Sequence, residues 1–196
     1  LPEETRERII GAAEGNPLFV EQLVAMQAEG GDILEVPPTL QALLAARIDR
    51  LGEHERAAAQ RGSVEGRLFH RGAVAGLLPE RDRADVGAHL LSLVRKELIR
   101  PDRAVLPGDD AFRFGHILIR DAAYDAIPKR QRAALHERFA EWMEARLGED
   151  APDEIVGYHL EQAYRYASEL GSPDARTGAR AADRLAAGAR HRLGAG

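Results

Sequence analysis

The stretch from Phe112 to Tyr124 constrains the fold of this chain more than any other part of the sequence. Phe112 and Phe114 alternate with Arg113, so the two rings share one face of a predicted strand that ends at Gly115. After the glycine, apolar residues recur every four positions, which predicts a helix. The rest of the chain has to fit around a strand that turns directly into a helix.

His116, Arg120 and Tyr124 are four residues apart and form a row along one side of that helix. His116 falls in the first turn, where free backbone N–H groups favour anions. Either a neutral imidazole donates a hydrogen bond to a phosphate there, or the side chain packs without a ligand. We expect the Tyr124 ring in the core with its hydroxyl at the rim, and Arg120 paired with an acidic group on a neighbouring helix.

The composition limits the class of protein. The chain has 196 residues, of which 44% are hydrophobic and 30% charged, as in a globular domain. Its net charge of -5 argues against wholesale binding to nucleic acid, and the absence of cysteine excludes disulfides and thiol chemistry. No apolar run is long enough to span a membrane and no signal peptide opens the chain, so we expect a cytoplasmic protein without a membrane partner. Because the chain starts at Leu1 and stops after a helical pattern, we expect a segment of a longer polypeptide.

Periodicity and turn residues predict a mainly helical chain with one β-hairpin. The hairpin joins a strand at Leu98–Arg100 to the strand at Phe112–Phe114. Three helices followed by such a hairpin form a winged-helix arrangement, which we assign to residues 37–115. Later helices with short breaks suggest the start of a helix-pair solenoid. The predicted helices cover Pro2–Ala13, a segment from Pro17 to Gly30, a segment from Thr39 to Leu51, Glu53–Val64, Arg71–Leu78, Asp82–Glu97, a segment after His116, Pro128–Gly148, Pro152–Leu170 and Asp174–Leu193. Gly30–Gly31 ends the second of these helices, and Thr39 is expected to assist the start of the third. The expected buried stripes include Val24, Leu91 and Leu170.

Four phrases of the sequence resemble one protein family. They are Gly15–Leu23, Val36–Leu51, the Phe112–Tyr124 stretch and Glu154–Leu160. Together they resemble the STAND class of signal-transduction ATPases, in the bacterial branch fused to class III adenylate cyclases or to LuxR-type DNA-binding domains. The resemblance implies that residues 1–36 are lid helices, 37–115 a winged helix, and 116–196 a helical linker with the start of a TPR-like repeat of antiparallel helix pairs.

The resemblance also implies the site residues and the partners. Asn16 and Pro17 fall on the lid motif whose proline packs near adenine, and His116 falls on the winged-helix histidine that contacts the β-phosphate of ADP. Arg120 and Tyr124 then support this nucleotide-binding set. The partners are a P-loop core of the same polypeptide, which holds ATP or ADP, and a protein or small-molecule signal on the helical repeat.

The sequence departs from the family in three ways. It has no glycine-rich loop ending in lysine and serine or threonine, and no apolar run ending in paired acidic residues. We therefore expect no catalysis and no tight nucleotide binding by this segment alone. Ile117 follows His116, where many relatives have an acidic residue.

Two other functions stay open. A DNA-binding winged-helix regulator would read DNA with the helix Asp82–Glu97, whose basic and acidic residues nearly balance, so nucleic acid is not the favoured partner. A helical protein-interaction scaffold would bind its partner on the helices after Pro128. We interpret one basic cluster as a solvated helix face rather than a nucleic-acid site, with intrahelical pairs to Glu137 and Glu141. Its residues are Lys129, Arg130, Arg132 and Arg138. His136 and His159 lack the spacing of a zinc helix, so no metal site is predicted.

Overall fold

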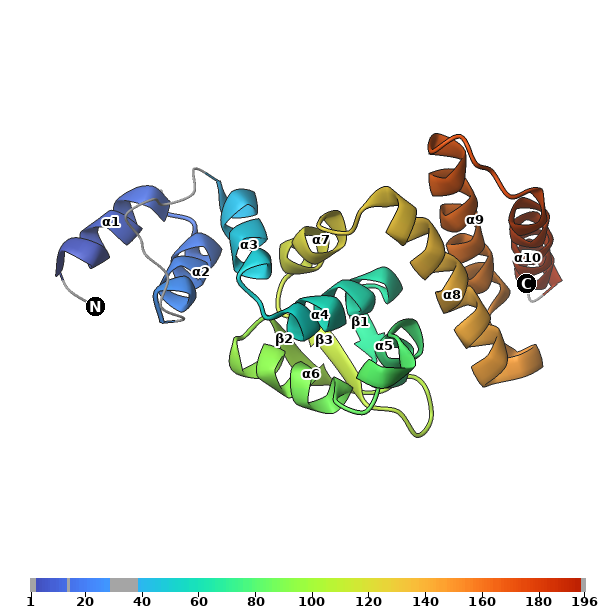
Figure 1. The fold of residues 1–196 in the computed structure, drawn as a ribbon, viewed down its shortest axis with the longest axis horizontal. Helices are drawn as coiled ribbons and strands as arrows, with labels where there is room; N and C mark the ends of the chain where they lie inside the picture. The colour runs from blue at the N-terminus through green and yellow to red at the C-terminus, as the bar shows by residue number, and fades with distance from the viewer. Residues whose placement is uncertain (1–2, 14, 29–38, 195–196) are drawn as a thin grey trace.

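The computed structural model describes residues 3–13, 15–28 and 39–194, which fold mainly into helices around one small antiparallel sheet (Figure 1). The helices are α1 Glu3–Ala13, α2 Pro17–Ala28, α3 Leu40–Asp49, α4 Glu53–Glu65, α5 Arg71–Leu77, α6 Val86–Arg95, α7 Ile117–Asp125, α8 Lys129–Leu147, α9 Asp153–Glu169 and α10 Ala175–Gly194, with short 3₁₀ turns η2 Glu80–Asp82 and η3 Gly148–Asp150. The strands are β1 Leu68–His70, β2 Ile99–Asp102 and β3 Ala111–Phe114. In the described ranges, no helix combines the length and the apolar character needed to cross a bilayer.

The first three helices share a small core. Its buried members are Ile9, Ala13, Phe19, Leu23, Met26 and Leu43. Thr39 caps α3 as predicted, because its hydroxyl accepts the backbone N–H of Ala42 at 3.1 Å. Val24, predicted on the buried face of α2, is instead 38% exposed. The predicted break at Gly30–Gly31 and the Val36–Pro38 part of the second phrase lie outside the described residues.

The predicted hairpin is confirmed, and a third strand joins it. β3 is the central strand, with β2 and β1 antiparallel on either side. Phe69 of β1 lies opposite Phe112, and its ring centroid is 5.0 Å from that of Phe114. A Cβ on Gly62 of α4 would lie 2.8 Å from the Phe69 ring, so the glycine lets α4 approach the sheet closely.

Helix α6 is shorter than the predicted helix Asp82–Glu97, because a 3₁₀ turn at Glu80–Asp82 and a bend and turn over residues 83–85 precede it and it ends at Arg95. Leu91, predicted in its buried stripe, is 55% exposed, whereas Leu90 and Leu93 are buried. The helix ends in a Schellman motif: the N–H of Leu98 donates to Leu93 O at 3.1 Å and that of Glu97 to Val94 O at 2.9 Å. Glu97 takes a φ of 58° there, a left-handed conformation that glycine normally supplies.

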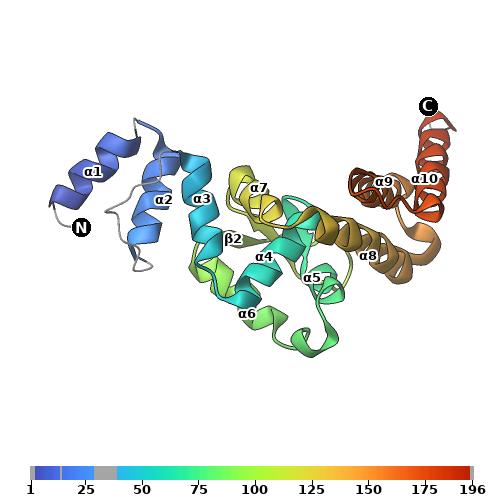
Figure 2. The same cartoon turned by 45° about the horizontal axis from the view of Figure 1, so that its top comes forward.

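Helices α8, α9 and α10 pack side by side at the end of the molecule farthest from α1 (Figure 2). Glycines let α9 and α10 approach, since a Cβ on Gly157 would lie 2.8 Å from Leu185. Glu144 of α8 pairs with Arg180 at 2.8 Å and Arg184 at 2.7 Å, so α10 is also tied to α8. Leu170, predicted in the buried stripe of α9, lies beyond the helix end and is 47% exposed.

Candidate functional site

The turn between α1 and α2 presents Asn16 and Pro17 at the surface. Gly15 has a φ of 80°, which turns the chain sharply, and Pro17 opens α2 as predicted. The side-chain oxygen of Asn16 accepts the backbone N–H of Phe19 at 3.3 Å, which caps the helix. Both residues are exposed beside this cap.

The turn between β3 and α7 fixes the protonation pattern of His116. His116 is the N-cap of α7, and its Nδ1 accepts the backbone N–H of Leu118 at 3.2 Å. Because a nitrogen that accepts carries no proton, the neutral ring has its proton on Nε2. The imidazole therefore has one N–H left to donate to a ligand.

These two turns meet at one pocket. A hollow of about 490 Å³ is lined by Asn16, Pro17, Leu18, Glu21, Gln22, Glu97, Gly115, His116 and Ile119. It brings together the three residues predicted as the nucleotide-binding set, although they come from opposite halves of the chain. Arg120 and Tyr124, predicted in support, do not line it.

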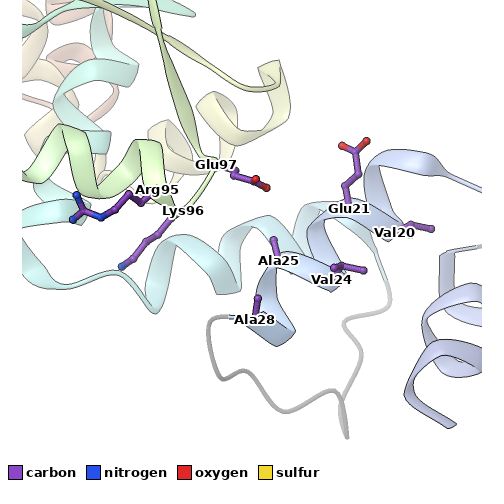
Figure 3. A pocket seen from close by; sticks show the side chains of 8 residues that line it. All are labelled: Val20, Glu21, Val24, Ala25, Ala28, Arg95, Lys96 and Glu97. Carbon is purple, nitrogen blue, oxygen red and sulfur yellow. The ribbon is translucent and has the colours of Figure 1, made fainter. Parts of the chain in front are cut away.

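A second hollow of about 580 Å³ adjoins the first, because Glu21 and Glu97 line both. Figure 3 shows Arg95, Lys96 and Glu97 at the end of α6, facing the Val20–Ala28 side of α2. Sequence reasoning missed Glu21, Gln22 and Glu97 as lining residues. Nothing local marked Glu97, since its place in the pocket depends on the left-handed turn after α6.

A buried arginine connects the walls of the first hollow. Arg47 of α3 is 1% exposed, and its guanidinium donates to Oε1 of Gln22 and, at 2.9 Å, to the carbonyl of Lys96. Charge-assisted hydrogen bonds of this kind are the stronger ones in proteins. Arg47 thus fixes α2 relative to the turn that carries Glu97.

Arg120 makes contacts other than the predicted pair with a neighbouring helix. Its Nε donates to the carbonyl of Ser63 in α4 at 2.9 Å, and its Nη1 lies 3.1 Å from the carboxylate of Asp121, the next residue. Its guanidinium also lies 4.6 Å from the ring centroid of Tyr124, so the predicted spacing of four does bring these two side chains together. Arg120 therefore holds α7 against α4.

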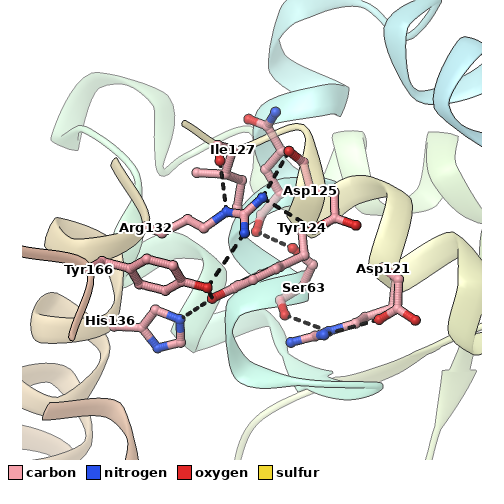
Figure 4. A network of polar contacts seen from close by, with 10 residues as sticks. Ser63, Asp121, Tyr124, Asp125, Ile127, Arg132, His136 and Tyr166 are labelled. Atoms are coloured by element: carbon pink, nitrogen blue, oxygen red, sulfur yellow. Dashed lines mark hydrogen bonds and ion pairs between the residues drawn. The ribbon is translucent and has the colours of Figure 1, made fainter. Parts of the chain in front are cut away.

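Tyr124 is the centre of a polar network (Figure 4). Its hydroxyl lies 2.7 Å from Nε2 of His136 and donates to the hydroxyl of Tyr166 at 3.1 Å. The Tyr124 hydroxyl, predicted at the rim, is part of a partly buried set of contacts with α8 and α9. Burial and the bond to Tyr166 raise the pKa of Tyr124, whereas hydrogen bonds from Tyr124 and Arg132 outweigh burial and lower the pKa of Tyr166.

The network continues into a buried histidine pair. Nδ1 of His136 lies 2.9 Å from Nδ1 of His159, and the two residues are 1% and 2% exposed. Burial, helped by the neighbouring His159 and nearby arginines, lowers the pKa of His136 to about 3, and burial lowers that of His159 to about 3. Both rings are therefore neutral. A single direction of hydrogen-bond donation then satisfies all the contacts, from His159 to His136, from His136 to Tyr124 and from Tyr124 to Tyr166. Within the described residues, no group of three or more histidine or carboxylate side chains has the geometry of a metal site.

The basic residues of α8 bond to other elements rather than to Glu137 and Glu141. Lys129 pairs with Glu169 at 2.8 Å, Arg132 with Asp125 at 3.2 Å, and Arg138 donates to the carbonyl of Gly76 at 3.1 Å. Glu137 instead accepts the hydroxyl of Thr177 in α10 at 3.0 Å. This arrangement uses the charges to join helices, so the prediction of intrahelical pairs is wrong for these contacts.

Comparison with known proteins adds little to this geometry. No family model matches the chain, and no solved structure matches it. An uncharacterized protein of Rhizobium meliloti (strain 1021) is similar, with 26% identity over 145 residues. These residues are 69% of this chain and 14% of the relative, so the chain spans a small part of that protein's length.

Proposed function

We propose that this chain is a regulatory, non-catalytic segment of a multidomain signal-transduction ATPase of the STAND class. Residues 1–36 act as its lid, 37–115 as a winged helix, and 116–196 as a linker with the first antiparallel helices of a TPR-like repeat. The segment closes over ADP or ATP held by a P-loop core elsewhere in the same cytoplasmic polypeptide. It couples the nucleotide to an effector such as an adenylate cyclase or a LuxR-type domain, in response to a signal on the repeat.

One observation carries this proposal: Asn16, Pro17 and His116 line a single pocket although they are far apart in the sequence. The free Nε2–H of His116 suits a phosphate oxygen, and the exposed ring of Pro17 suits the flat face of a base. An adenine nucleotide such as ADP has both a phosphate and a flat base to offer these two side chains.

The charge of the pocket indicates why the core is required. Glu21 and Glu97 line the pocket, and no lysine or arginine does so among the described residues. Both carboxylates are exposed, so solvent screens their charge, but they still repel the anionic phosphates of a nucleotide. A P-loop lysine and Mg²⁺ from the core would offset this repulsion. The segment alone is therefore expected to bind nucleotide weakly.

The order of elements supports the winged helix and disfavours its use on DNA. Helices α4, α5 and α6 precede the β2–β3 hairpin, and β1 completes the sheet. On α6, the exposed positions include Ala88 and Leu91, and Lys96 after it pairs with Glu55 at 2.6 Å. Arg95 is the one exposed cation within α6, and a face with so few cations gains little from DNA phosphates.

A protein-interaction scaffold is the second candidate, because α9 exposes apolar side chains. Ile155 is 43% exposed, Tyr158 47% and Tyr164 38%. Exposed aromatic groups of this kind are enriched in protein interfaces. This reading predicts a partner on α9 and no dependence on nucleotide.

The test is the rate of ADP release from the full-length polypeptide. His116→Ala removes one hydrogen bond to a charged group, worth about 1.5–3 kcal/mol, so release should accelerate roughly tenfold to a hundredfold and basal output should rise. His54→Ala, an exposed histidine on α4, is the matched control and should release ADP like the unchanged protein. Equal release rates for the two variants, or no retained ADP, would contradict the proposal. A salt-dependent shift of random duplex DNA would favour the DNA-binding alternative instead.

A further inference from the structure

His70 is a buried histidine outside the candidate site, at the junction of β1 and α5. It is 4% exposed, and three different groups contact its ring. Nδ1 lies 2.6 Å from Oε1 of Glu65, the last residue of α4. On the other side of the ring, Nε2 lies 3.3 Å from the backbone nitrogen of Val105 and 3.4 Å from that of Leu106. The imidazole therefore joins α4 to the loop 103–110 between β2 and β3.

The hydrogen-bonding groups around the ring determine which tautomer the neutral imidazole adopts. A carboxylate only accepts hydrogen bonds, so Nδ1 must carry the proton and donate it to Glu65. Backbone N–H groups only donate, so Nε2 must be unprotonated to accept from Val105 and Leu106. The observed contacts need neutral His70 in this one tautomer.

A second proton changes the two sides of the ring in opposite ways. It turns the hydrogen bond to Glu65 into an ion pair, which is stronger. It also places a new N–H at Nε2 against two backbone N–H groups, where donors meet donors and no hydrogen bond remains. Protonation thus strengthens the contact to α4 and removes the contact to the loop.

The other charged groups around His70 favour the proton or hold the far end of the loop. Asp109 adds to the effect of Glu65, so the pKa of His70 is raised above its ordinary value by these carboxylates in spite of burial. Asp109 also accepts the backbone N–H of Gly72 at 3.0 Å, and Asp110 pairs with Arg71 at 3.3 Å. These contacts do not involve the ring, so the second half of the loop stays attached to α5.

We propose that His70 is a proton-controlled latch, which holds the first half of the β2–β3 loop closed while its ring is neutral and releases it when Nε2 is protonated. The released part includes Val105, which is already 72% exposed, and Pro107. The carbonyl of Pro107 accepts Nη2 of Arg146 at 3.1 Å. Since Arg146 belongs to the last turn of α8, opening the loop also breaks this contact between the loop and α8.

As pH rises, the stability that the His70–Glu65 pair contributes decreases, whereas closure of the loop increases. Because the pKa of His70 is raised on folding, the stability from its pair with Glu65 is fully present below the unfolded pKa of about 6.5 and is lost as pH rises through the folded pKa. Loop closure instead requires the neutral ring and is present above the folded pKa. If the whole protein loosened instead, the N–H of Gly72, which Asp109 holds, would lose its protection together with the loop.

The experiment measures amide hydrogen exchange by NMR on the chain between pH 8 and pH 5.5, corrected for intrinsic rates. Protection of Val105 and Leu106 should fall at least tenfold, with the same midpoint as the titration of the His70 ring followed by its ¹⁵N shifts. The N–H of Gly72, which Asp109 holds, should stay protected. Constant protection of the two loop amides through the titration, or a ring that does not titrate in this range, would overturn the proposal.

A neutral variant separates protonation from packing. His70→Gln keeps a donor for Glu65 and an acceptor for the loop, so its loop should stay protected at every pH. His89→Gln, on a partly buried histidine of α6, is the matched control and should keep the full pH response. A loop that opens with acid in His70→Gln as well would assign the opening to another group. If His70→Gln does not fold, the coincidence of the two midpoints in the unchanged chain still decides the question.

Discussion

The hydroxyl of Tyr124 lies 2.7 Å from Nε2 of His136, and this contact joins α7 to α8. The same oxygen lies 3.1 Å from the hydroxyl of Tyr166 on α9, so one atom connects three helices. Arg132 stacks on the ring, with its guanidinium 4.5 Å from the ring centroid. Tyr124 is therefore one of the contacts that set the orientation of α8 and α9 relative to α7.

Replacing Tyr124 with phenylalanine should destabilise the protein without creating a cavity. The change leaves His136 and Tyr166 each without one partly buried hydrogen bond, which costs about 1–3 kcal/mol at most. Urea unfolding at pH 7 measures this loss. Tyr164→Phe, on a tyrosine that is 38% exposed, is the control and should change stability by less than about 0.5 kcal/mol. Equal losses of unfolding free energy in the two variants would show that the Tyr124 network does not contribute to stability.

The His136–His159 pair predicts a loss of stability in acid. In the unfolded chain both histidines take up a proton near pH 6.5, whereas the pKa of each in the folded protein is about 3. Between these values the unfolded state binds more protons, so stability falls as pH drops from about 6.5 to 3, by at most about 1.4 kcal/mol per pH unit for each histidine.

The slope of unfolding free energy against pH, from urea titrations at pH 7, 6 and 5, tests this prediction. His159→Asn keeps a neutral hydrogen-bonding group and should reduce the slope, whatever its effect at pH 7. His54→Asn, on an exposed histidine, should leave the slope unchanged. A His159→Asn slope equal to that of the unchanged protein would refute the assignment of acid sensitivity to the pair.

The features that were predicted correctly from the sequence are those set by residues a few positions apart, such as helix starts and the β3 strand. Pro17 and Thr39 mark helix starts, and the Phe112–Phe114 alternation marks a strand, because each depends on neighbours within a few residues. Strand β1 was missed since it has three residues and pairs with β3 more than forty positions later. Such a strand has no periodicity of its own.

The same limit applies to the site and the network. His136 and His159 are 23 residues apart in different helices, so no spacing rule brings them together. Leu91 fits the apolar stripe of α6 and is still exposed, because burial depends on what packs against the helix. Periodicity does not relate α2 to α7 either, so it could not place Pro17 and His116 at one pocket.

Glu97 adopts a conformation that glycine would adopt at lower cost. Its φ of 58° places an L side chain in the left-handed region, and its place after α6 is the one that glycine favours. Glu97→Gly should therefore raise the free energy of unfolding by up to about 1 kcal/mol. Glu97→Ala removes the same carboxylate but keeps the Cβ, so it should not stabilise. A gain in both variants would assign the effect to charge in the pocket rather than to the backbone.

Gly76 and Gly87 form a matched pair for testing how α5 meets α8. A Cβ on Gly76 would collide with Cδ1 of Trp142 in α8, whereas a Cβ on Gly87 of α6 would meet nothing within 4 Å. Gly76→Ala should then cost about 1–3 kcal/mol through overpacking, because the indole has to move. Gly87→Ala should instead stabilise by roughly 0.5–1 kcal/mol, through the helix propensity of alanine. Urea unfolding gives both values, and near-ultraviolet circular dichroism of Trp142 reports whether the ring has moved. A Gly76→Ala variant as stable as Gly87→Ala would mean that α5 and α8 are not in close contact in solution.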